Sequence, residues 1–412
     1  MKYCLLGEKL SHSYSKEIHN SCGLDYCLEE VSPCMIGDFA SSFKYSGYNV
    51  TIPYKKVIMN YLDEISDEAR TIGAVNTVAI KDGKRKGYNT DVYGLYYPLE
   101  RIGVSLSGKT VMILGTGGAS NAVKYVCEKL NASEIIIVGR TSPVNYENCY
   151  DKVGVQVIFN ATPVGMSSNV DASPIDLSKF GSLEAVIDLI YNPQKTEFLL
   201  QAESLNIKCS NGLPMLVEQA LCSEDIWLDK KHDKSLTEEI IKKISLEKLN
   251  VCLWGMPSSG KSSVGKLLAS NLGRDFFDLD EEITARVGKT PSEIINSEGE
   301  TVFRDIETKV LKELALKSNA VISLGGGAVI REENRKSVAK NSISVYIKRD
   351  LSLLQTDGRP LSVKKGVETL FSERKDFYET ADITVENNGD INDTIKEIIK
   401  AYETFSTQRS KS

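Results

Sequence analysis

Histidine is scarce in this sequence, and the nine cysteines form no C-x-x-C pair. The three histidines, His12, His19 and His232, stand at no zinc-ligand spacing from the cysteines, so a metal centre built from His and Cys is not expected. An odd number of cysteines without paired spacing is also unlike a disulfide framework. We therefore expect reduced thiols and a cytoplasmic protein.

Long apolar runs and a surplus of positive charge are missing as well. No segment approaches the roughly 18 consecutive apolar residues that a membrane span needs, and the start MKYCLLGEKL does not fit a signal peptide. The formal net charge of −6 argues against a general nucleic-acid binder. Neither a membrane nor a nucleic-acid partner is expected, small phosphorylated ligands stay compatible with this charge, and the oligomeric state is left open.

The 412 residues contain two regions in which strands and helices alternate, separated by the charged, weakly apolar stretch Leu228–Asn250. In each region a short apolar strand is followed at once by a glycine-rich turn and a helix with apolar residues at helical spacing. These strands are Val111–Leu114 and Val251–Trp254. The pattern predicts an α/β protein with two nucleotide-binding modules.

The residues before the first glycine turn carry short strands of their own, at Tyr3–Gly7, Tyr48–Ile52 and Val75–Ile80. We expect residues 1–100 to form a separate substrate-binding lobe, completed by helices within 214–247. Between these parts, residues 101–213 form a Rossmann-like dinucleotide domain. Residues 249–405 form the second module, and residues 406–412 a flexible tail.

The first glycine turn reads Gly115-Thr116-Gly117-Gly118-Ala119, with Ser120 where a dinucleotide fingerprint has its third glycine. Glycines there let the backbone approach a pyrophosphate at a helix N-terminus, where free amides and the helix dipole favour anions. A tight turn without a ligand is the alternative. The next strand, Glu134–Val138, leads into Arg140 instead of the acidic residue that binds the ribose of NAD, which favours the 2′-phosphate of NADP.

Six short segments with unusual polar content follow one another in a fixed order. This ordered set resembles that of shikimate dehydrogenases, over about residues 1–247. The resemblance implies NADPH-dependent, reversible reduction of 3-dehydroshikimate to shikimate. The segments are Leu10-Ser-His-Ser-Tyr-Ser15, Asn49-Val-Thr-Ile-Pro-Tyr-Lys55, Gly73-Ala-Val-Asn-Thr77, Asn89-Thr-Asp91, Gly115–Ala119 and Asn211-Gly-Leu-Pro-Met215.

On the matching positions, the resemblance implies that Lys55 and Asp91 are the catalytic pair. Hydride delivery to a carbonyl carbon leaves an alkoxide, which an ammonium can protonate while a carboxylate orients it. An ordinary surface salt bridge is the alternative for this pair. The resemblance also implies substrate contacts from Ser13, Ser15, Thr51, Asn76, Asp91, Tyr191 and Gln219, and cofactor contacts from Gly115–Ala119, Arg140, Thr141 and Gly212.

The second glycine turn, Gly255-Met-Pro-Ser-Ser-Gly-Lys-Ser262, matches the P-loop pattern G-x-x-x-x-G-K-[ST] in full. Its amides would cradle phosphates, Lys261 would reach the β and γ groups, and Ser262 would bind Mg²⁺. Further on, Asp278-Leu-Asp280 follows two phenylalanines. If this segment is extended, both carboxylates lie on one face, one suited to Mg²⁺ and the other to an acceptor hydroxyl.

Four later segments complete a second ordered set, which resembles shikimate kinases over about residues 249–405. The resemblance implies a P-loop domain like that of nucleoside monophosphate kinases, and phosphorylation of shikimate to shikimate 3-phosphate with ATP and Mg²⁺. These segments are Phe303-Arg304, Ser323-Leu-Gly-Gly-Gly-Ala328, Gly358-Arg-Pro-Leu361 and Glu373-Arg-Lys-Asp-Phe-Tyr378.

The kinase resemblance implies a role for each matching residue. Asp280 would position the acceptor hydroxyl, Ser262 and Asp278 would hold the magnesium ion, and Arg304 and Arg374 would pair with the substrate carboxylate beside Gly326. Arg359 would reach the transferring phosphate from a lid at about 350–363. The nucleotide contacts would come from Gly255, Ser258, Ser259, Gly260, Lys261, Ser262 and Ser263.

The two assignments support each other, because the product of the first reaction is the acceptor of the second. One alternative keeps both folds but has the first half act on quinate or a similar acid and the second on gluconate or a nucleotide. Another is a non-catalytic nucleotide-sensing scaffold with one decayed half. The presence of Lys55, Asp91, Lys261, Ser262 and Asp280 speaks against the scaffold.

Overall fold

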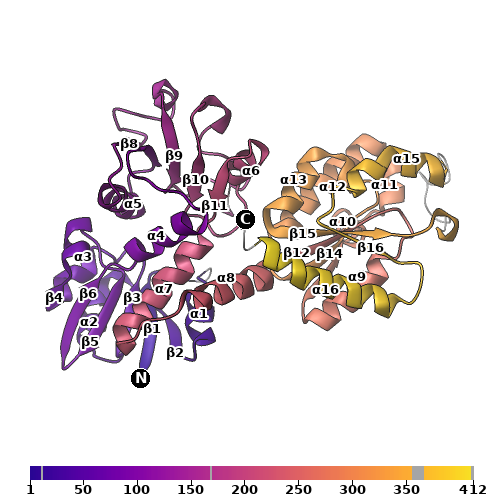
Figure 1. Ribbon diagram of the computed structural model, residues 1–412. Coiled ribbons are helices and arrows are strands. Elements are labelled where there is room, and N and C mark those ends of the chain that lie inside the picture. Colours follow the sequence, from indigo (N-terminus) through magenta and orange to yellow (C-terminus); the bar gives the residue numbers. More distant parts are fainter. Residues whose placement is uncertain (11–12, 168, 355–365, 410–412) are drawn as a thin grey trace. The chain divides into compact units, whose positions relative to one another are not determined.

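The computed structural model describes residues 1–10, 13–167, 169–354 and 366–409. They form two compact units (Figure 1). The first unit comprises Met1–Asn192 and Thr196–Ile244, and the second comprises Pro193–Lys195 and the residues from Ser245 onward. No helix in the described part of the chain is both long and apolar enough to cross a membrane.

A six-stranded mixed sheet forms the leading lobe of the first unit, with the strand order β2-β1-β3-β5-β6-β4. β1 pairs in parallel with β2 and β3, whereas β5 runs antiparallel to β3 and β6. The ends of β1, β3 and β6 and the start of β5 therefore meet at one edge of the sheet. The strands are β1 (Lys2–Gly7), β2 (Asp25–Glu30), β3 (Gly47–Val50), β4 (Glu64–Ile65), β5 (Thr77–Lys81) and β6 (Lys84–Tyr88).

Helix α7 (Leu213–Leu228) returns to this lobe after the chain has passed through the next domain. It packs closely against α4 (Asp91–Arg101). At the contact, a Cβ on Gly94 would stand only 2.6 Å from the carbonyl oxygen of Met215, so glycine allows this close approach. Near its end, Trp227 donates from Nε1 to the Val78 carbonyl at 2.9 Å. The other helices of the lobe are α1 (Ser15–Ser21), α2 (Ile36–Ser41), α3 (Asp67–Ile72) and α8 (Lys234–Lys248).

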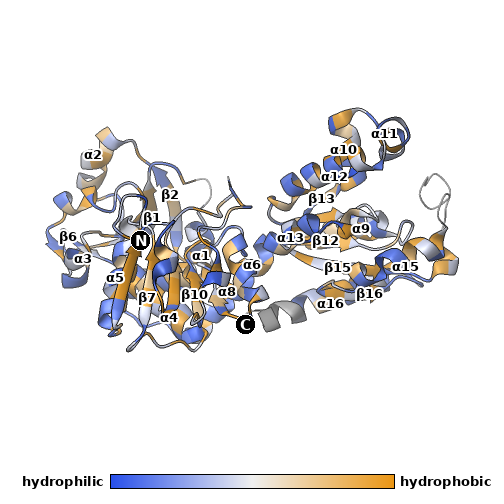
Figure 2. Ribbon diagram, turned by 90° about the horizontal axis from the view of Figure 1, so that it is seen from above, coloured by the Kyte–Doolittle hydropathy of each residue, from blue (hydrophilic) through white to orange (hydrophobic). Residues whose placement is uncertain are grey.

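The second sheet of the first unit is fully parallel, with the order β11-β10-β9-β7-β8. Alternate residues of β7 enter two different apolar clusters, one on each face, so this strand is a continuous apolar run. Figure 2 shows β7 and β10 mainly in the colour of hydrophobic residues. The elements are β7 (Thr110–Leu114), α5 (Gly118–Lys129), β8 (Glu134–Val138), β9 (Val155–Asn160), β10 (Ala185–Asp188), α6 (Glu197–Ser204) and β11 (Lys208–Ser210).

The second unit contains a parallel sheet in the order β13-β14-β12-β15-β16. Its central strand β12 places Val251 and Leu253 in one apolar cluster and Cys252 and Trp254 in the other. The strands are β12 (Asn250–Trp254), β13 (Asp275–Asp278), β14 (Ala320–Ser323), β15 (Ser342–Lys348) and β16 (Ile383–Glu386). The helices are α9 (Lys261–Leu272), α10 (Leu279–Val287), α11 (Pro291–Glu298), α12 (Glu300–Ala315), α13 (Glu332–Asn341), α15 (Val367–Tyr378) and α16 (Ile391–Arg409).

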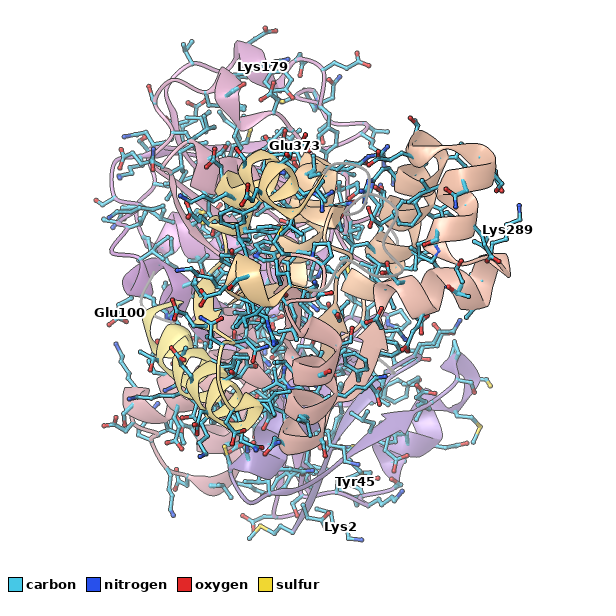
Figure 3. All side chains as sticks on the ribbon, turned by 90° about the vertical axis from the view of Figure 1, so that its right-hand side faces the viewer. Lys2, Tyr45, Glu100, Lys179, Lys289 and Glu373 are labelled. Carbon is cyan, nitrogen blue, oxygen red and sulfur yellow. The ribbon has the colours of Figure 1, made fainter. Side chains whose placement is uncertain are left out.

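Charged side chains are distributed over the outside of both units. Lys2, Lys179 and Lys289 are exposed and project away from the ribbon (Figure 3). The parallel strands are buried on both faces of their sheets. The polar surface is therefore formed mainly by the outer faces of the helices.

The predicted α/β class is confirmed, since each glycine turn follows an interior strand of a parallel sheet. Several boundaries differ from the sequence prediction, and β5, for example, begins at Thr77 and not at Val75. β3 ends at Val50, before the predicted Ile52, and α16 continues to Arg409, so residues 406–409 belong to this helix and not to a tail. β13 ends at Asp278 and α10 begins at Leu279, so Asp278 and Asp280 do not lie along one strand.

Asp188, at the end of β10, is a buried carboxyl with a perturbed titration. It is fully buried, and burial raises its pKa to about 6. Its oxygens accept hydrogen bonds from Thr196 at 2.5 Å, Asn160 at 3.0 Å and the Ile190 amide at 3.1 Å. These bonds favour the charged form but do not fully offset its desolvation.

Because the folded state holds the Asp188 proton more tightly than the unfolded state, the free energy of unfolding should fall as pH rises from about 4 to 6, by up to about 3 kcal/mol. Asp188→Asn should remove this part of the pH dependence. Thermal unfolding of the variant and the parent at pH values below and above this window measures it. The substitution also alters the contact with Thr196. The loss of stability from this contact is the same at both pH values, so it cancels when the two values are compared.

The exposed Asp151, in the same domain, provides the matched control. Asp151→Asn should follow the parent at both pH values. An Asp188→Asn protein with the parent's pH dependence would show that this buried carboxyl does not titrate in the window.

Candidate functional sites

The predicted catalytic pair forms at the edge of the leading sheet where the strand ends meet. Lys55 follows β3, and Asp91 begins α4 directly after β6. Lys55 Nζ donates to Asp91 Oδ2 at 2.6 Å. Their side chains are 27% and 13% exposed, so the pair is sheltered by protein and still accessible to a small molecule.

Asn76, at the start of β5, fixes the orientation of Asp91. Its Nδ2 donates to Asp91 Oδ1 at 2.8 Å, and its Oδ1 accepts from the Thr90 amide at 2.7 Å. The same Nδ2 lies 3.3 Å from Oε1 of Gln219 on α7. The structure thus brings together Lys55, Asp91, Asn76 and Gln219 from separate parts of the sequence.

The remaining predicted substrate residues lie outside this hydrogen-bonded group. Ser13 Oγ and Ser15 Oγ are 3.1 Å apart at the start of α1. Tyr191 packs against Tyr14, with ring centroids 5.0 Å apart, and burial raises its pKa. Thr51 follows β3 and bonds through its backbone amide to Leu6.

A buried asparagine that carried no predicted role supports the site from below. Asn49 lies in β3, and its Nδ2 lies within hydrogen-bond distance of Thr77 Oγ1 at 3.1 Å and Ser223 Oγ at 2.9 Å. Its Nδ2 also lies 3.3 Å from the Asn76 carbonyl, which can only accept, so its Oδ1 accepts from the Tyr26 hydroxyl at 2.8 Å and lies 3.1 Å from His19 Nε2. An asparagine inside a fully buried strand was the sequence signal for this role.

His19 joins Asn49 to a glutamate of α7. Its Nε2 lies 3.1 Å from Asn49 Oδ1, and its Nδ1 lies 2.7 Å from Glu224 Oε1. His19 and Glu224 form a buried pair on α1 and α7, 205 positions apart in sequence.

The first glycine turn lies between β7 and α5, at the carboxyl end of the parallel sheet. Gly115 has a φ of +108°, and a Cβ there would lie 3.0 Å from the Ala161 carbonyl. A Cβ on Gly117 or Gly118 would meet only open space. The turn is therefore closed against β9 on one side and open at the helix N-terminus, as anion binding requires.

Arg140 and Thr141 lie exposed just after β8, next to this turn. Within the described residues, Arg140 forms no hydrogen bond or ion pair, so its guanidinium is available to a phosphate. Gly139 allows the loop after β8 to approach the glycine turn closely. A Cβ at this position would lie only 2.6 Å from Thr116 Cγ2. Gly212 packs against the end of β10, where a Cβ would stand 2.2 Å from the Leu189 carbonyl.

The second glycine turn wraps around the side chain of Lys261. Lys261 Nζ lies 3.1 Å from the Gly255 carbonyl and 2.8 Å from the Met256 carbonyl, and the residue is 8% exposed. Gly255, Ser258 and Gly260 all have positive φ, at +146°, +66° and +93°. This is the geometry that points successive amides into one concavity.

A cavity of about 310 Å³ opens in front of this turn. Ser262 Oγ donates to Asp278 Oδ2 at 2.5 Å, and Asp278 Oδ1 accepts from the Asp280 amide at 3.0 Å. Although Asp280 lies in the first turn of α10, it faces the same cavity as Asp278. The lining comprises Ser258, Gly260, Lys261, Ser262, Ser263, Asp278, Asp280, Ser323, Leu324, Gly325 and Gly326.

Ser259 is not among the lining residues. It is fully buried, and its carbonyl accepts from Asn387 Nδ2 at 2.8 Å. Asn387, directly after β16, had no predicted role and instead braces the phosphate loop from behind. A Cβ on Gly260 would lie 2.5 Å from the same Nδ2, so only glycine fits there.

The two predicted carboxylate-binding arginines are both buried in the second unit. Arg304 pairs with the fully buried Glu307 at 2.7 Å, and a Cβ on Gly327 would lie 2.3 Å from its Nη2. Arg374 is 3% exposed, and its Nε has no hydrogen-bond partner among the described residues. Tyr378, beside Arg374, donates to the Gly326 carbonyl at 2.5 Å, and burial raises its pKa to about 12.

Glu307 was missed in the sequence, although it stands one helical turn after Arg304. Burial raises its pKa, while the Arg304 charge opposes this shift. A Cβ on Gly325 would lie 2.8 Å from Glu307 Oε1 and 3.2 Å from Asp280 Oδ1, so both carboxylates reach the glycine segment. Arg359 and most of the predicted lid lie outside the described residues.

Comparison with known proteins assigns both units. Residues 5–78 match the model of the shikimate dehydrogenase substrate binding domain, and residues 257–403 match that of shikimate kinase. The chain is 39% identical over 257 residues to the shikimate dehydrogenase (NADP(+)) of Clostridium beijerinckii, covering 57% of this chain and 95% of the relative.

Solved structures agree with this relationship. Shikimate dehydrogenase 1 from Peptoclostridium difficile is 40% identical with a TM-score of 0.55, covering 60% of this chain and 98% of that one. The Thermus thermophilus enzyme, solved with NADP(H) and shikimate, is 30% identical with a TM-score of 0.54, covering 59% and 99%. The predicted resemblances are confirmed: the chain belongs to the shikimate dehydrogenase family, and a shikimate kinase domain follows in the same polypeptide.

Proposed function

We propose that the first unit interconverts 3-dehydroshikimate and shikimate with NADP(H), and that the second phosphorylates shikimate with Mg-ATP. The observation that carries the first activity is the Lys55–Asp91 contact of 2.6 Å at a sheltered sheet edge. The observation that carries the second is the cavity that joins the phosphate loop to Asp278 and Asp280.

In the first reaction, bound NADPH supplies a hydride to the carbonyl carbon. The electrons of the carbonyl double bond move to oxygen, and the Lys55 ammonium donates the proton that completes the hydroxyl. Asp91 holds Lys55 in place, and Asn76 holds Asp91. Water returns a proton to the lysine, so the cycle balances. The reverse reaction uses Lys55 as the base.

The neighbouring polar groups suit a small hydroxylated acid. The hydroxyls of Ser13 and Ser15 lie together and would hold its carboxylate. Thr51, Asn76 and Gln219 would contact its hydroxyl groups, with Tyr191 beside the ring. Amides and hydroxyls around one ion pair suit a substrate that is neutral except for its carboxylate.

The fit to NADP rests on the first glycine turn and on Arg140. The open N-terminus of α5 at Gly117 and Gly118 would accept the pyrophosphate, and Arg140 and Thr141 would hold the 2′-phosphate. Gly212 would pass close to the cofactor at the end of β10. An exposed guanidinium without a protein partner at this strand end is the feature that distinguishes NADP from NAD.

The second unit has the donor set that Mg-ATP requires. Ser262 and Asp278 place two hard oxygen atoms side by side, the type of ligand that Mg²⁺ prefers. Lys261 would release the loop carbonyls to reach the phosphates, and Asp280 would orient the shikimate hydroxyl that attacks the γ-phosphorus. Arg304 and Arg374 would bind the carboxylate beside Gly326, and Arg359 would reach the phosphate being transferred.

We also propose the functional boundaries 1–100 with 214–247, 101–213 and 249–405. The break between the two compact units at Ile244 and Ser245 supports the division between the two activities. We place the enzyme in the cytoplasm, with small-molecule substrates as its partners.

Lys55→Ala should slow NADP-linked oxidation of shikimate by about 10²-fold or more, because the alkoxide loses its proton donor. Steady-state rates with shikimate and NADP measure this, and quinate serves as the competing substrate. Lys56→Ala alters the exposed neighbour and should leave the rate unchanged. A loss of less than about threefold in Lys55→Ala would remove the lysine from the acid/base role.

Lys261→Ala should reduce phosphorylation of shikimate by about 10²-fold or more while dehydrogenation persists, because the γ-phosphate loses a preorganised charge. A coupled assay for ADP release measures the kinase rate. Lys266→Ala, in the same helix, removes an exposed lysine and should retain activity. Full phosphorylation by the Lys261 variant would contradict the P-loop assignment.

The whole proposal predicts that the purified chain converts 3-dehydroshikimate, NADPH and ATP with Mg²⁺ into shikimate 3-phosphate. Loss of absorbance by NADPH and mass detection of the product report the two steps separately. In Lys55→Ala the first step should fail while added shikimate is still phosphorylated. If shikimate accumulates and is never phosphorylated by the parent chain, the kinase half is inactive on this acceptor.

A further inference from the structure

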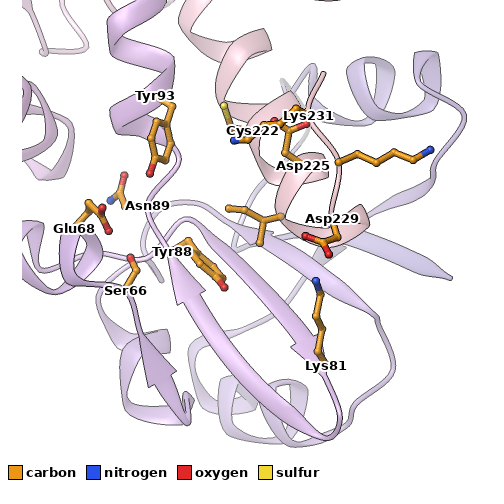
Figure 4. A pocket seen from close by; sticks show the side chains of 12 residues that line it. Ser66, Glu68, Lys81, Tyr88, Asn89, Tyr93, Cys222, Asp225, Asp229 and Lys231 are labelled. Atoms are coloured by element: carbon orange, nitrogen blue, oxygen red, sulfur yellow. The ribbon is translucent and has the colours of Figure 1, made fainter. Parts of the chain in front are cut away.

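A second cavity opens in the first unit, away from the catalytic pair. Its volume is about 490 Å³, within the range of about 300–1,000 Å³ typical of small-molecule sites. It lies between the β5–β6 hairpin, the start of α3, the start of α4 and the end of α7 (Figure 4). None of the residues assigned above to substrate, cofactor or catalysis lines it. We call it the hairpin pocket.

The middle of the hairpin pocket is aromatic and apolar. Tyr88 ends β6 and Tyr93 stands on α4, and both contribute ring surface, with Ile226 and Cys222 facing them from α7. Tyr93 is 45% exposed, so part of its ring is accessible to a ligand. A flat ring that lies against these groups would bury apolar surface on both sides.

Charges of both signs surround this apolar middle in equal number. The lining has three lysines, Lys81, Lys230 and Lys231, and three acids, Glu68, Asp225 and Asp229. This balance favours a ligand without net charge over a phosphate or a polyamine.

One carboxylate of the hairpin pocket stands apart from its lysines. In Figure 4, Glu68 and Asn89 lie on one side of Tyr88, and Lys81 and Lys231 lie on the other, together with Asp225 and Asp229. Glu68, Lys81 and Lys231 form no salt bridge within the described residues. Asp225 is already engaged, since it accepts from the backbone amide of His232 at 2.9 Å and contacts its Nδ1 at 3.0 Å.

The side chain of Asn89 gives independent evidence that the hairpin pocket binds a ligand. It is 2% exposed and lines the hairpin pocket, and its Nδ2 donates to the Ala74 carbonyl at 2.9 Å. Its Oδ1 has no hydrogen-bond partner among the described residues. A buried acceptor left unpaired costs about 1–3 kcal/mol, so a ligand with an N–H donor would relieve it.

We propose that the hairpin pocket binds a small zwitterion with a flat ring, of the class of free aromatic α-amino acids. The ammonium lies at Glu68 and the Asn89 oxygen, the ring lies on Tyr88 and Tyr93, and the carboxylate lies at Lys81 and Lys231. Its charged groups would meet Glu68, Lys81 and Lys231, which form no salt bridge in the described part of the chain, and the Asn89 oxygen, which has no hydrogen-bond partner there.

The hairpin pocket is connected to the catalytic pair through Asn89. Asp91 is two residues further along the chain, and the Ala74 carbonyl held by Asn89 is two residues before Asn76. Both Asp91 and Asn76 belong to the group that orients Lys55. Occupation of the pocket therefore changes dehydrogenase turnover and leaves the kinase rate unchanged; this second statement rests on the proposed dehydrogenase function, whereas the binding does not.

Isothermal titration of the full chain with L-phenylalanine tests the binding. We expect saturable binding, weakened about tenfold or more for phenylacetate and phenethylamine, which each lack one of the two charges. Glu68→Gln and Lys231→Gln should each weaken L-phenylalanine by a similar factor. The matched controls Asp67→Asn and Lys84→Gln, which alter charges beside the pocket, should bind like the parent.

Three results would overturn the proposal. The first is no heat of binding up to about 10 mM L-phenylalanine, L-tyrosine or L-tryptophan. The second is equal binding of phenylacetate, which would make this a site for simple carboxylates. The third is unaltered affinity in both pocket variants, which would place the ligand elsewhere. Binding without any change in dehydrogenase kinetics would leave the site standing and disprove its connection to Lys55.

Discussion

The position of Lys55 in the first unit depends on a set of buried side chains that hydrogen-bond to one another. Asn76 and Asn49 stand at the centre of this arrangement, and each joins strands of the sheet to α7 through side-chain amides. A buried amide in a low-dielectric interior is costly unless it is fully hydrogen-bonded, so the set holds one arrangement. The position of Asp91, and through it Lys55, follows from contacts that lie largely beneath the substrate.

In the second unit, the buried polar groups around the site are not all paired. Its phosphate loop is braced from behind by Asn387, and Arg304 is neutralised by Glu307, but Glu307 Oε1 and Arg374 Nε have no partner in the described residues. A ligand that pairs these two atoms would add order to the kinase site.

The elements that carry nucleotide chemistry could be predicted from the sequence because they are local. A strand, a glycine turn and a helix occupy a short run of successive residues, and their apolar spacing and glycines leave few other structures possible. Lys55 and Asp91 are 36 positions apart, and the ordered motifs singled them out through the family resemblance. Asp278 and Asp280 were found as a pair whose common face depended on an extended segment. Asp278 instead caps α10, which the glutamate three residues later, Glu281, could have indicated.

The residues that the sequence did not reveal act through distant contacts. His19 and Glu224 are 205 positions apart, Asn387 and Ser259 are 128 apart, and neither member of each pair is unusual in its own segment. Asn49 and Glu307 offered a weak local signal, one as a polar residue in an apolar strand and the other as an acid one turn from a key arginine. Ser259 was placed among the nucleotide contacts by its position in the loop, yet it is buried in the core.

Helix α7 also bears on how the protein is made. Trp227 packs with Tyr3, Leu5 and Tyr26 from the first two strands, but it is synthesised only after the entire parallel domain that follows the lobe. On the ribosome, those early strands must wait, with their apolar faces uncovered, until some two hundred further residues have been added. The kinase domain begins only after this closing helix, so the nascent chain can complete its first catalytic half before the second starts to emerge.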